Sequence, residues 1–529
     1  MDVAKTLFFG WDGVPPKVIM DGIGYGYLPN MKDLIDSGLF GVLKSELPIV
    51  TPANWYSALT GYKPFRHGVV NFAVVDRDYT LRYMSILDLK VDGIWSYLTR
   101  YGYEGLYVNI PISTPAPRVK GLWIAQEQEF VGPIKPKTYH IYPEDYLDKV
   151  DALGFLVGYP FYSGKPRIYA EKVRDVEEAK LKAFYDLLRE DRYYLNLFIA
   201  MSPDILLHIF MDDEDYMDEV YKTLNMLDRW LGKFMDYLGE NANYIIISDH
   251  GHSRKKGLVN ILKILENLGY LYRAKRYRIR ASWIRRSQLI RRLWGILPQR
   301  VKSRLSKEIN KFILLDSPSR ELIVNVDWER TKVFPLINVG GLKVNLKDRY
   351  KSGIVESDEI NSIAEELTKK LRELNVDGET MFKDIEIHLN DDPYIPDILL
   401  ELHRDYWFIS SSEDREIIYF DLPKLTDDLD LKRYSTTVSN HIRDAFYVLS
   451  GKVFNKGDSN PTLRIVDMAP SILYLFDIPI PSDIDGTINK DLFKREFFEE
   501  RRPKYTRYKG VKIKKRLVKV RRKVRKRRG

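Results

Sequence analysis

The sequence of 529 residues contains no cysteine. Disulfide bonds and thiolate metal sites are therefore excluded, so any metal ion must be bound by histidine and carboxylate side chains. No apolar run approaches the roughly 20 residues of a membrane span. The N-terminus also lacks the basic segment and longer apolar run of a signal peptide. We therefore expect a cytoplasmic protein, which could still lie peripherally on a membrane surface.

Acidic residues are scarce in two segments that are rich in lysine and arginine. Residues 501–529 hold 17 Lys and Arg and no acid, and without them the net charge of +10 becomes −7. Residues 270–311 hold 14 Lys and Arg against one acid, and without them as well the remainder stands at −20. An acidic body therefore carries two basic segments, which indicates an anionic partner for those segments rather than for the whole surface.

Short apolar runs alternate with longer helical patterns along the chain. The runs are typical of buried strands and cover residues 6–10, 106–109, 195–201, 244–248 and 445–449. Helical spacing of apolar residues covers 31–37, 173–189 and 217–238. This alternation predicts βαβ units, and therefore an α/β fold around a mainly parallel sheet.

Carboxylate and imidazole side chains recur beside these predicted strands, at Asp12, Asp204, Asp249, His250 and His441. Ligands of parallel sheets bind beyond the carboxyl ends of the strands, so the recurrence predicts one cluster. Asp204 and His208 are four residues apart, and a helical turn would project both to one side. Each residue alone also has an ordinary explanation, such as a turn acid for Asp12 or a surface ion pair for Asp204 and His208.

Metal binding is favoured by the positions of the few histidines. Only eight are present, and three of them, His208, His250 and His441, fall beside the predicted strands or pair with Asp204. Acid and imidazole ligands accept either Zn²⁺ or Mn²⁺. Two ions about 4 Å apart would suit in-line displacement at phosphorus.

Thr51 is the candidate nucleophile. It precedes Pro52, a residue favoured at the start of a helix, so its hydroxyl would lie at a helix N-terminus. The helix dipole there favours an alkoxide and a phosphate group, and a metal contact would activate the hydroxyl further. Taken alone, Thr51 is better explained as a plain helix cap.

Seven short blocks follow one another in a characteristic order. They are Gly10-Trp11-Asp12-Gly13, Thr51-Pro52-Ala53-Asn54-Trp55, Thr60-Gly61 with His67-Gly68, Asp204 to His208, Ser248-Asp249-His250-Gly251, Asn440-His441 with Arg443-Asp444, and residues 465–474 through Asp485-Gly486. The order resembles the alkaline phosphatase superfamily, in its branch of type I phosphodiesterases and nucleotide pyrophosphatases. The prokaryotic members described as predicted phosphohydrolases or phosphomutases are the most similar.

This resemblance implies an α/β/α sandwich with two divalent metal ions, usually zinc. Asp12, Asp249 and His250 resemble the ligands of one ion, with Thr51 bridging, and Asp204, His208 and His441 resemble those of the other. Attack by Thr51 on phosphorus would form a phospho-threonine intermediate, which water then hydrolyses. Asn71 resembles a phosphate-binding Asn of the family, although it falls one position early. His67 is open between a structural and a functional role, and His140, His252, His388 and His403 are predicted to be non-catalytic.

The expected domains follow from the motifs and the charge. Residues 1–270 and 317–490 would form the catalytic domain, with a smaller α/β subdomain over 331–430. Residues 271–316 would be a basic amphipathic helical insertion, acting as a lid or an interfacial anchor. Residues 491–529 would be a flexible basic tail that could bind an anionic membrane surface or RNA.

The leading hypothesis is a phosphodiesterase or pyrophosphatase. Its substrate would be an anionic phosphoester, such as a nucleotide, a nucleotide-sugar or a phospholipid head group. A phosphomutase of the same superfamily is an alternative. A third alternative, of another class, is a non-catalytic scaffold that binds nucleic acid or membrane. The oligomeric state is not indicated by the sequence.

Overall fold

The computed structural model describes residues 3–125, 140–160, 165–274, 326–337, 340–403, 406–411, 414–419, 425–426, 437–457 and 461–508. The larger lobe is built on a nine-stranded sheet with the order β22-β2-β21-β9-β1-β8-β5-β6-β7. Its strands are β1 (Thr6–Trp11), β2 (Leu39–Lys44), β5 (Gly105–Val108), β6 (Gly121–Ile124), β7 (Ile141–Tyr142), β8 (Leu195–Ala200), β9 (Asn243–Ile247), β21 (Asp444–Ser450) and β22 (Leu463–Arg464).

The strands at the centre of this sheet run parallel. β1 pairs in parallel with β8 and with β9, and β5 pairs in parallel with β8 and with β6. These strands are apolar and almost entirely buried, as expected for a sheet covered on both faces. The predicted mainly parallel α/β sheet is therefore confirmed.

One predicted strand runs in the opposite direction. The apolar run at 445–449 is β21, which pairs antiparallel with both β2 and β9, so its expected place among parallel strands was wrong. The reversal has a consequence for the site. The residues that precede β21 lie at the same edge of the sheet as the residues that follow the parallel strands.

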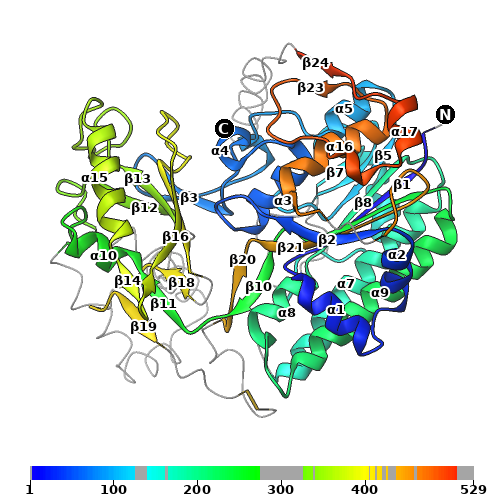
Figure 1. Ribbon diagram of the computed structural model, residues 1–529, viewed down its shortest axis with the longest axis horizontal. Coiled ribbons are helices and arrows are strands. Elements are labelled where there is room, and N and C mark those ends of the chain that lie inside the picture. Colours follow the sequence, from blue (N-terminus) through cyan, green and yellow to red (C-terminus); the bar gives the residue numbers. More distant parts are fainter. Residues whose placement is uncertain are drawn as a thin grey trace, which may run out of the picture.

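Helices pack on both faces of the sheet, which gives the three layers of a sandwich (Figure 1). One group holds α1 (Pro16–Gly24), α2 (Pro29–Ser37), α7 (Pro166–Leu188), α8 (Ser202–Phe210) and α9 (Met217–Leu238), and the other holds α3 (Thr51–Thr60), α5 (Ile94–Arg100) and α16 (Met468–Leu475). The other α-helices in the described residues are α4 (Pro64–His67), α6 (Leu147–Ala152), α10 (Ile261–Asn267), α15 (Ile360–Arg372) and α17 (Arg495–Glu500). No helix in the described part of the chain is long and apolar enough to cross a membrane.

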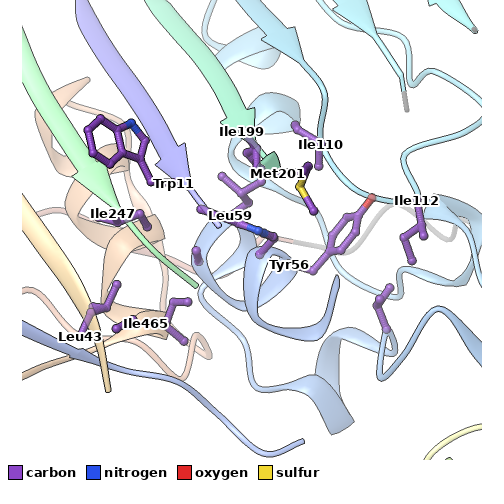
Figure 2. Close-up of a cluster of buried hydrophobic side chains, with 14 of the residues drawn as sticks. Trp11, Leu43, Tyr56, Leu59, Ile110, Ile112, Ile199, Met201, Ile247 and Ile465 are labelled. Atoms are coloured by element: carbon purple, nitrogen blue, oxygen red, sulfur yellow. The ribbon is translucent and has the colours of Figure 1, made fainter. Parts of the chain in front are cut away.

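Apolar packing holds α3 against the sheet. Figure 2 shows Tyr56 and Leu59 of α3 in one cluster with Ile199 of β8 and Met201, and with Ile247 of β9 nearby. All five side chains are buried. Since α3 begins at Thr51, this packing fixes the position of that residue relative to the strand ends.

A smaller lobe lies beside the large sheet (Figure 1). An antiparallel sheet contains β12 (Val333–Ile337), β13 (Gly341–Val344), β17 (Ile398–Leu402) and β16 (Phe382–Ile387), and a second sheet contains β18 (Tyr406–Ile409), β11 (Gly257–Asn260) and β19 (Ile417–Tyr419). Between the lobes runs a ribbon of two antiparallel strands, β10 (Gly251–Arg254) and β20 (Ser439–Ile442). Short hairpins are formed by β3 (Ala73–Val75) with β4 (Leu81–Tyr83) and by β14 (Asn375–Val376) with β15 (Glu379–Thr380).

Only parts of the two predicted basic segments are described by the structure. Residues 275–316 of the predicted insertion and 509–529 of the predicted tail lie outside the described residues. Residues 491–508, however, pack on the body, because Leu492, Phe493 and Phe497 are buried. β24 (Tyr505–Thr506) also pairs with β23 (Ile480–Pro481). The expected boundary at residue 490 therefore falls too early, since the apolar residues beyond it belong to the core.

Candidate active site

Segments that are distant in sequence meet at the carboxyl edge of the large sheet. Asp12 follows β1, Asp204 lies in the first turn of α8 just after β8, and Asp249 with His250 follows β9. Thr51 opens α3, and His441 lies on β20 just before the reversed strand β21. The structure thus brings together the seven residues that the sequence motifs suggested as nucleophile and metal ligands.

The first group of side chains surrounds the Thr51 hydroxyl and comprises Asp12, Thr51, Asp249 and His250; we call it the Thr51 cluster. Thr51 Oγ1 lies 3.2 Å from His250 Nε2. The same nitrogen lies 3.3 Å from Asp249 Oδ2 and 3.7 Å from Asp12 Oδ1. All four residues are buried, so their polar atoms face one another rather than solvent.

Asp12 and Asp249 are held in place from behind. The Trp55 indole N–H donates a 2.7 Å hydrogen bond to Asp12 Oδ2, and the Gly13 backbone N–H donates to Asp249 Oδ1 at 3.3 Å. The other oxygen of each carboxylate, Asp12 Oδ1 and Asp249 Oδ2, is buried and receives no hydrogen bond from the described residues. Buried carboxylate oxygens without donors require another positive partner, and a divalent cation fits this requirement.

The second group comprises Asp204, His208, His441 and His252; we call it the Asp204 cluster. One ligand atom from each lies within 4.8 Å of the others. Asp204 Oδ1 lies 3.5 Å from His208 Nε2 and 3.4 Å from His441 Nε2, and the two imidazole nitrogens are 3.0 Å apart. The predicted helical pairing of Asp204 with His208 is confirmed by their positions in α8.

The two clusters adjoin each other. Ligand atoms of Asp12, Asp204 and His250 lie within 4.8 Å of one another, and the rings of His250 and His441 stack with centroids 3.6 Å apart. Two ions at the two clusters would therefore be close enough to act on one phosphoryl group.

Burial sets the protonation states of the clusters. It raises the pKa of Asp12 well above its ordinary value, with the charges of Asp249 and Asp204 adding to the effect, and it raises the pKa of Asp249 likewise. Burial lowers the pKa of His208 and of His250 well below the ordinary value, which keeps both rings neutral. Neutral imidazoles are the form that binds a divalent metal, and a bound cation would favour ionisation of the two buried carboxyl groups.

His252, which the sequence predicted to be non-catalytic, lies in the Asp204 cluster. Its Nε2 lies 2.8 Å from Asp204 Oδ1, and it is buried. Burial also lowers the pKa of His252 to about 4. A signal was present in the sequence, because residues two apart in an extended segment project to the same side and His252 follows His250 by two.

Lys255 is a second residue that the sequence did not single out. It follows β10, is buried, and donates a 2.8 Å hydrogen bond to Thr437 Oγ1. Burial lowers its pKa to about 7. When charged, Lys255 lowers the pKa of His208 and of His252, because it lies close to the Asp204 cluster.

The other predicted residues lie elsewhere or act structurally. His67 is buried and its Nδ1 accepts from the Val69 N–H, so its Nε2–H faces Ser57 Oγ and the Ala53 carbonyl, both at 3.1 Å. These contacts fix the loop after α3, which is a structural role. Asn71 Oδ1 accepts a hydrogen bond from the backbone N–H of Phe72. This contact does not test phosphate binding by Asn71, which stays a prediction.

The remaining histidines occupy other parts of the molecule. His388 pairs with Glu386 and His403 with Glu379, both in the smaller lobe, and His140 is exposed.

Comparison with known proteins gives a family and a fold. The family model described as "Type I phosphodiesterase / nucleotide pyrophosphatase" matches residues 6–432, which include every cluster residue except His441. Comparison with curated protein sequences gave no match.

Two similar solved structures are both phosphonoacetate hydrolase from Sinorhizobium meliloti 1021. The complex with phosphonoformate superposes with a TM-score of 0.53 at 14% identity, over 88% of this chain and 94% of that one. The complex with phosphonoacetate gives a TM-score of 0.51 at the same identity and coverage. At this identity the likeness shows a shared fold.

Proposed function

The chain belongs to the type I phosphodiesterase/nucleotide pyrophosphatase family, and from that premise we propose that Thr51 is the nucleophile of a two-metal site. A member of this family is a hydrolase of phosphoric ester or phosphoanhydride bonds, and the non-catalytic scaffold is not retained. The observation that carries the proposal is the position of the Thr51 hydroxyl. It is buried, opens α3, and lies 3.2 Å from His250 among two carboxylates.

The residues around Thr51 favour attack on phosphorus. The positive end of the α3 dipole is directed at the hydroxyl, where it stabilises an alkoxide and an incoming phosphate. Asp12, Asp249 and His250 would hold one divalent ion with Thr51, and Asp204, His208 and His441 would hold the other. When bound, such ions lower the pKa of the nucleophile and neutralise charge on the transferred group. We propose zinc, because the resemblance to the superfamily implies it and imidazole and carboxylate ligands bind it.

Thr51 Oγ1 would then form a bond to phosphorus as the leaving oxygen departs. The resulting phospho-threonine would be hydrolysed by water, which returns the Thr51 hydroxyl. The Thr51 cluster is buried, so the 3.2 Å contact of Thr51 Oγ1 with His250 Nε2 is made without competition from bulk water.

The substrate class is proposed as a phosphodiester or a nucleotide-like pyrophosphate. The panel to be measured contains bis-aryl phosphate, nucleotide-sugars, phosphomonoesters and phospholipid head groups. It also includes phosphonoacetate, because the similar solved structure is a phosphonoacetate hydrolase. Release of two products indicates hydrolysis, whereas a single isomerised phosphoester would indicate a phosphomutase.

The direct test of the nucleophile replaces its hydroxyl. In zinc-loaded protein, Thr51→Ala should lower kcat for bis-aryl phosphate by at least about 10³-fold, and Thr51→Ser should retain measurable turnover. Thr60→Ala is the matched control, because Thr60 ends the same helix, is buried, and donates to the Tyr56 carbonyl. Unchanged zinc-dependent hydrolysis by Thr51→Ala would show that the nucleophile is another group.

A further inference from the structure

The ribbon of β10 and β20 places two histidines directly opposite each other. In its antiparallel register His252 pairs with His441, so both side chains project from the same face of the ribbon. Their rings lie 5.0 Å apart. His441 belongs to the ligand set that the family motifs suggest, whereas His252 does not. The register therefore brings an additional imidazole to the Asp204 cluster.

Contacts with Ser439 hold the other side of the His252 ring. Ser439 Oγ lies 2.7 Å from His252 Nδ1 and 2.9 Å from the Leu207 carbonyl oxygen, to which it can donate. When Ser439 donates to Leu207, His252 Nδ1 donates to Ser439, and a neutral ring then has its lone pair on Nε2. A contact of this kind on the far nitrogen is what orients a metal-binding imidazole.

His252 Nε2 is directed at the Asp204 cluster and lies 2.8 Å from Asp204 Oδ1. In the tautomer with the proton on Nδ1, a cation bound by both atoms makes this short approach favourable. Ligand atoms of Asp204, His208, His252 and His441 all lie within 4.8 Å of one another, which suits a single tetrahedral ion.

Gly13 leaves the space that this arrangement needs. Its backbone has a φ of +76°, and a Cβ at this position would lie 2.9 Å from both Asp204 Oδ1 and His252 Nε2. A side chain on residue 13 would therefore press on the two atoms that face each other. The glycine allows the loop after β1 to pass close to both ligands.

We propose that His252 is a fourth protein ligand of the divalent ion held by Asp204, His208 and His441. This inference rests on the proposed metal-dependent function. Three imidazoles and one carboxylate would complete a tetrahedral set from the protein alone. Substrate oxygen would then enter as a fifth ligand.

A structure of the zinc-loaded protein with anomalous scattering at the zinc edge tests the proposal. The expected result is a His252 Nε2–zinc distance of about 2.0–2.1 Å. An ion held by Asp204, His208 and His441, with His252 more than about 3 Å away and hydrogen-bonded to Asp204, would overturn this inference and leave the proposed function intact. Absence of zinc from both clusters would overturn the two together.

Substitutions separate a ligand from a residue that positions Asp204, because Gln can donate an amide N–H to Asp204 whereas Ala cannot. For a ligand, His252→Gln and His252→Ala should both weaken one of two zinc sites by at least about 10-fold in chelator competition. For a positioning donor, His252→Gln would retain zinc affinity near that of the wild type, which would overturn the proposal. His388→Gln is the matched control, since His388 lies in the smaller lobe beside Glu386.

Discussion

The indole N–H of Trp55 donates a 2.7 Å hydrogen bond to Asp12 Oδ2 from the helix that begins at Thr51. One helix therefore supplies both the candidate nucleophile and the group that orients a candidate metal ligand. The hydrogen bond occupies one oxygen of Asp12 and directs the other toward His250. Loss of a hydrogen bond that orients a metal ligand typically lowers metal affinity and activity.

Trp55→Phe should weaken metal binding at the Thr51 cluster. The ring is largely replaced but the N–H is lost, so Asp12 loses its orientation, and we expect metal affinity to fall by about 10–100-fold. Chelator competition measures the change. Trp123→Phe is the matched control, because Trp123 is also fully buried and its N–H has no partner among the described residues. Equal metal affinity in Trp55→Phe and Trp123→Phe would contradict the assigned role of Asp12.

Gly13→Ala should disrupt the site and cost stability. The backbone is left-handed at this position, which costs a non-glycine residue about 1–3 kcal/mol, and the new Cβ would collide with Asp204 and His252. Gly24→Ala is the control, since Gly24 ends α1 with no atom near its Cβ position. Denaturant unfolding and zinc titration should show losses in Gly13→Ala alone. Zinc affinity near wild type in Gly13→Ala would show that the loop after β1 can move away.

Asp249→Asn should stabilise the metal-free protein while reducing the stability that it gains from zinc. Burial and the charge of Asp204 raise the pKa of Asp249. A carboxyl whose folded pKa exceeds its unfolded value contributes less to stability as pH rises above the unfolded pKa, so at pH 7 the Asp249 carboxyl destabilises the fold. In chelator, the variant should therefore have the higher melting temperature. With zinc, the variant should gain less stability than the wild type, because the Asp204 cluster can still bind one ion. A lower melting temperature of Asp249→Asn in chelator would contradict this assignment of charge.

The pH dependence of unfolding should report on His67. Burial lowers its pKa from 6.5 to about 3, so between these values the unfolded chain binds a proton that the folded chain does not. Stability therefore falls as pH decreases through this window, by up to about 1.4 kcal/mol per pH unit for one group. In chelator, His67→Gln should show a slope smaller by about one proton between pH 6 and 4. An unchanged slope would mean that His67 is not buried in its neutral form.

Positions fixed by local pattern were predictable from the sequence. The helix at 217–238 has the expected bounds, because its apolar spacing is regular over many turns. The residues beside β1, β8 and β9 were predictable as one cluster, since parallel strands end at the same edge. The acids and histidines that recur at this edge therefore indicated the candidate site, although the sequence predicts no distance between them.

Features that depend on long-range pairing were not predictable. The direction of β21 follows from its route through the smaller lobe, which the apolar run at 445–449 does not encode. His252 enters the site because β10 pairs in register with β20, nearly 190 residues later. The contact of Trp55 with Asp12 likewise depends on how α3 packs against the sheet. The sequence motifs include both residues but do not predict the hydrogen bond between them.

The central claim is that Thr51 carries the phosphoryl group during turnover. Zinc-loaded protein mixed with bis-aryl phosphate, quenched in acid at early times and analysed by peptide mass spectrometry, measures this directly. We expect phosphate on the peptide that contains Thr51, with the modification lost in Thr51→Ala and retained in Thr60→Ala. Product formation in a first turnover, with no phosphorylated Thr51 at any quench time, would contradict it.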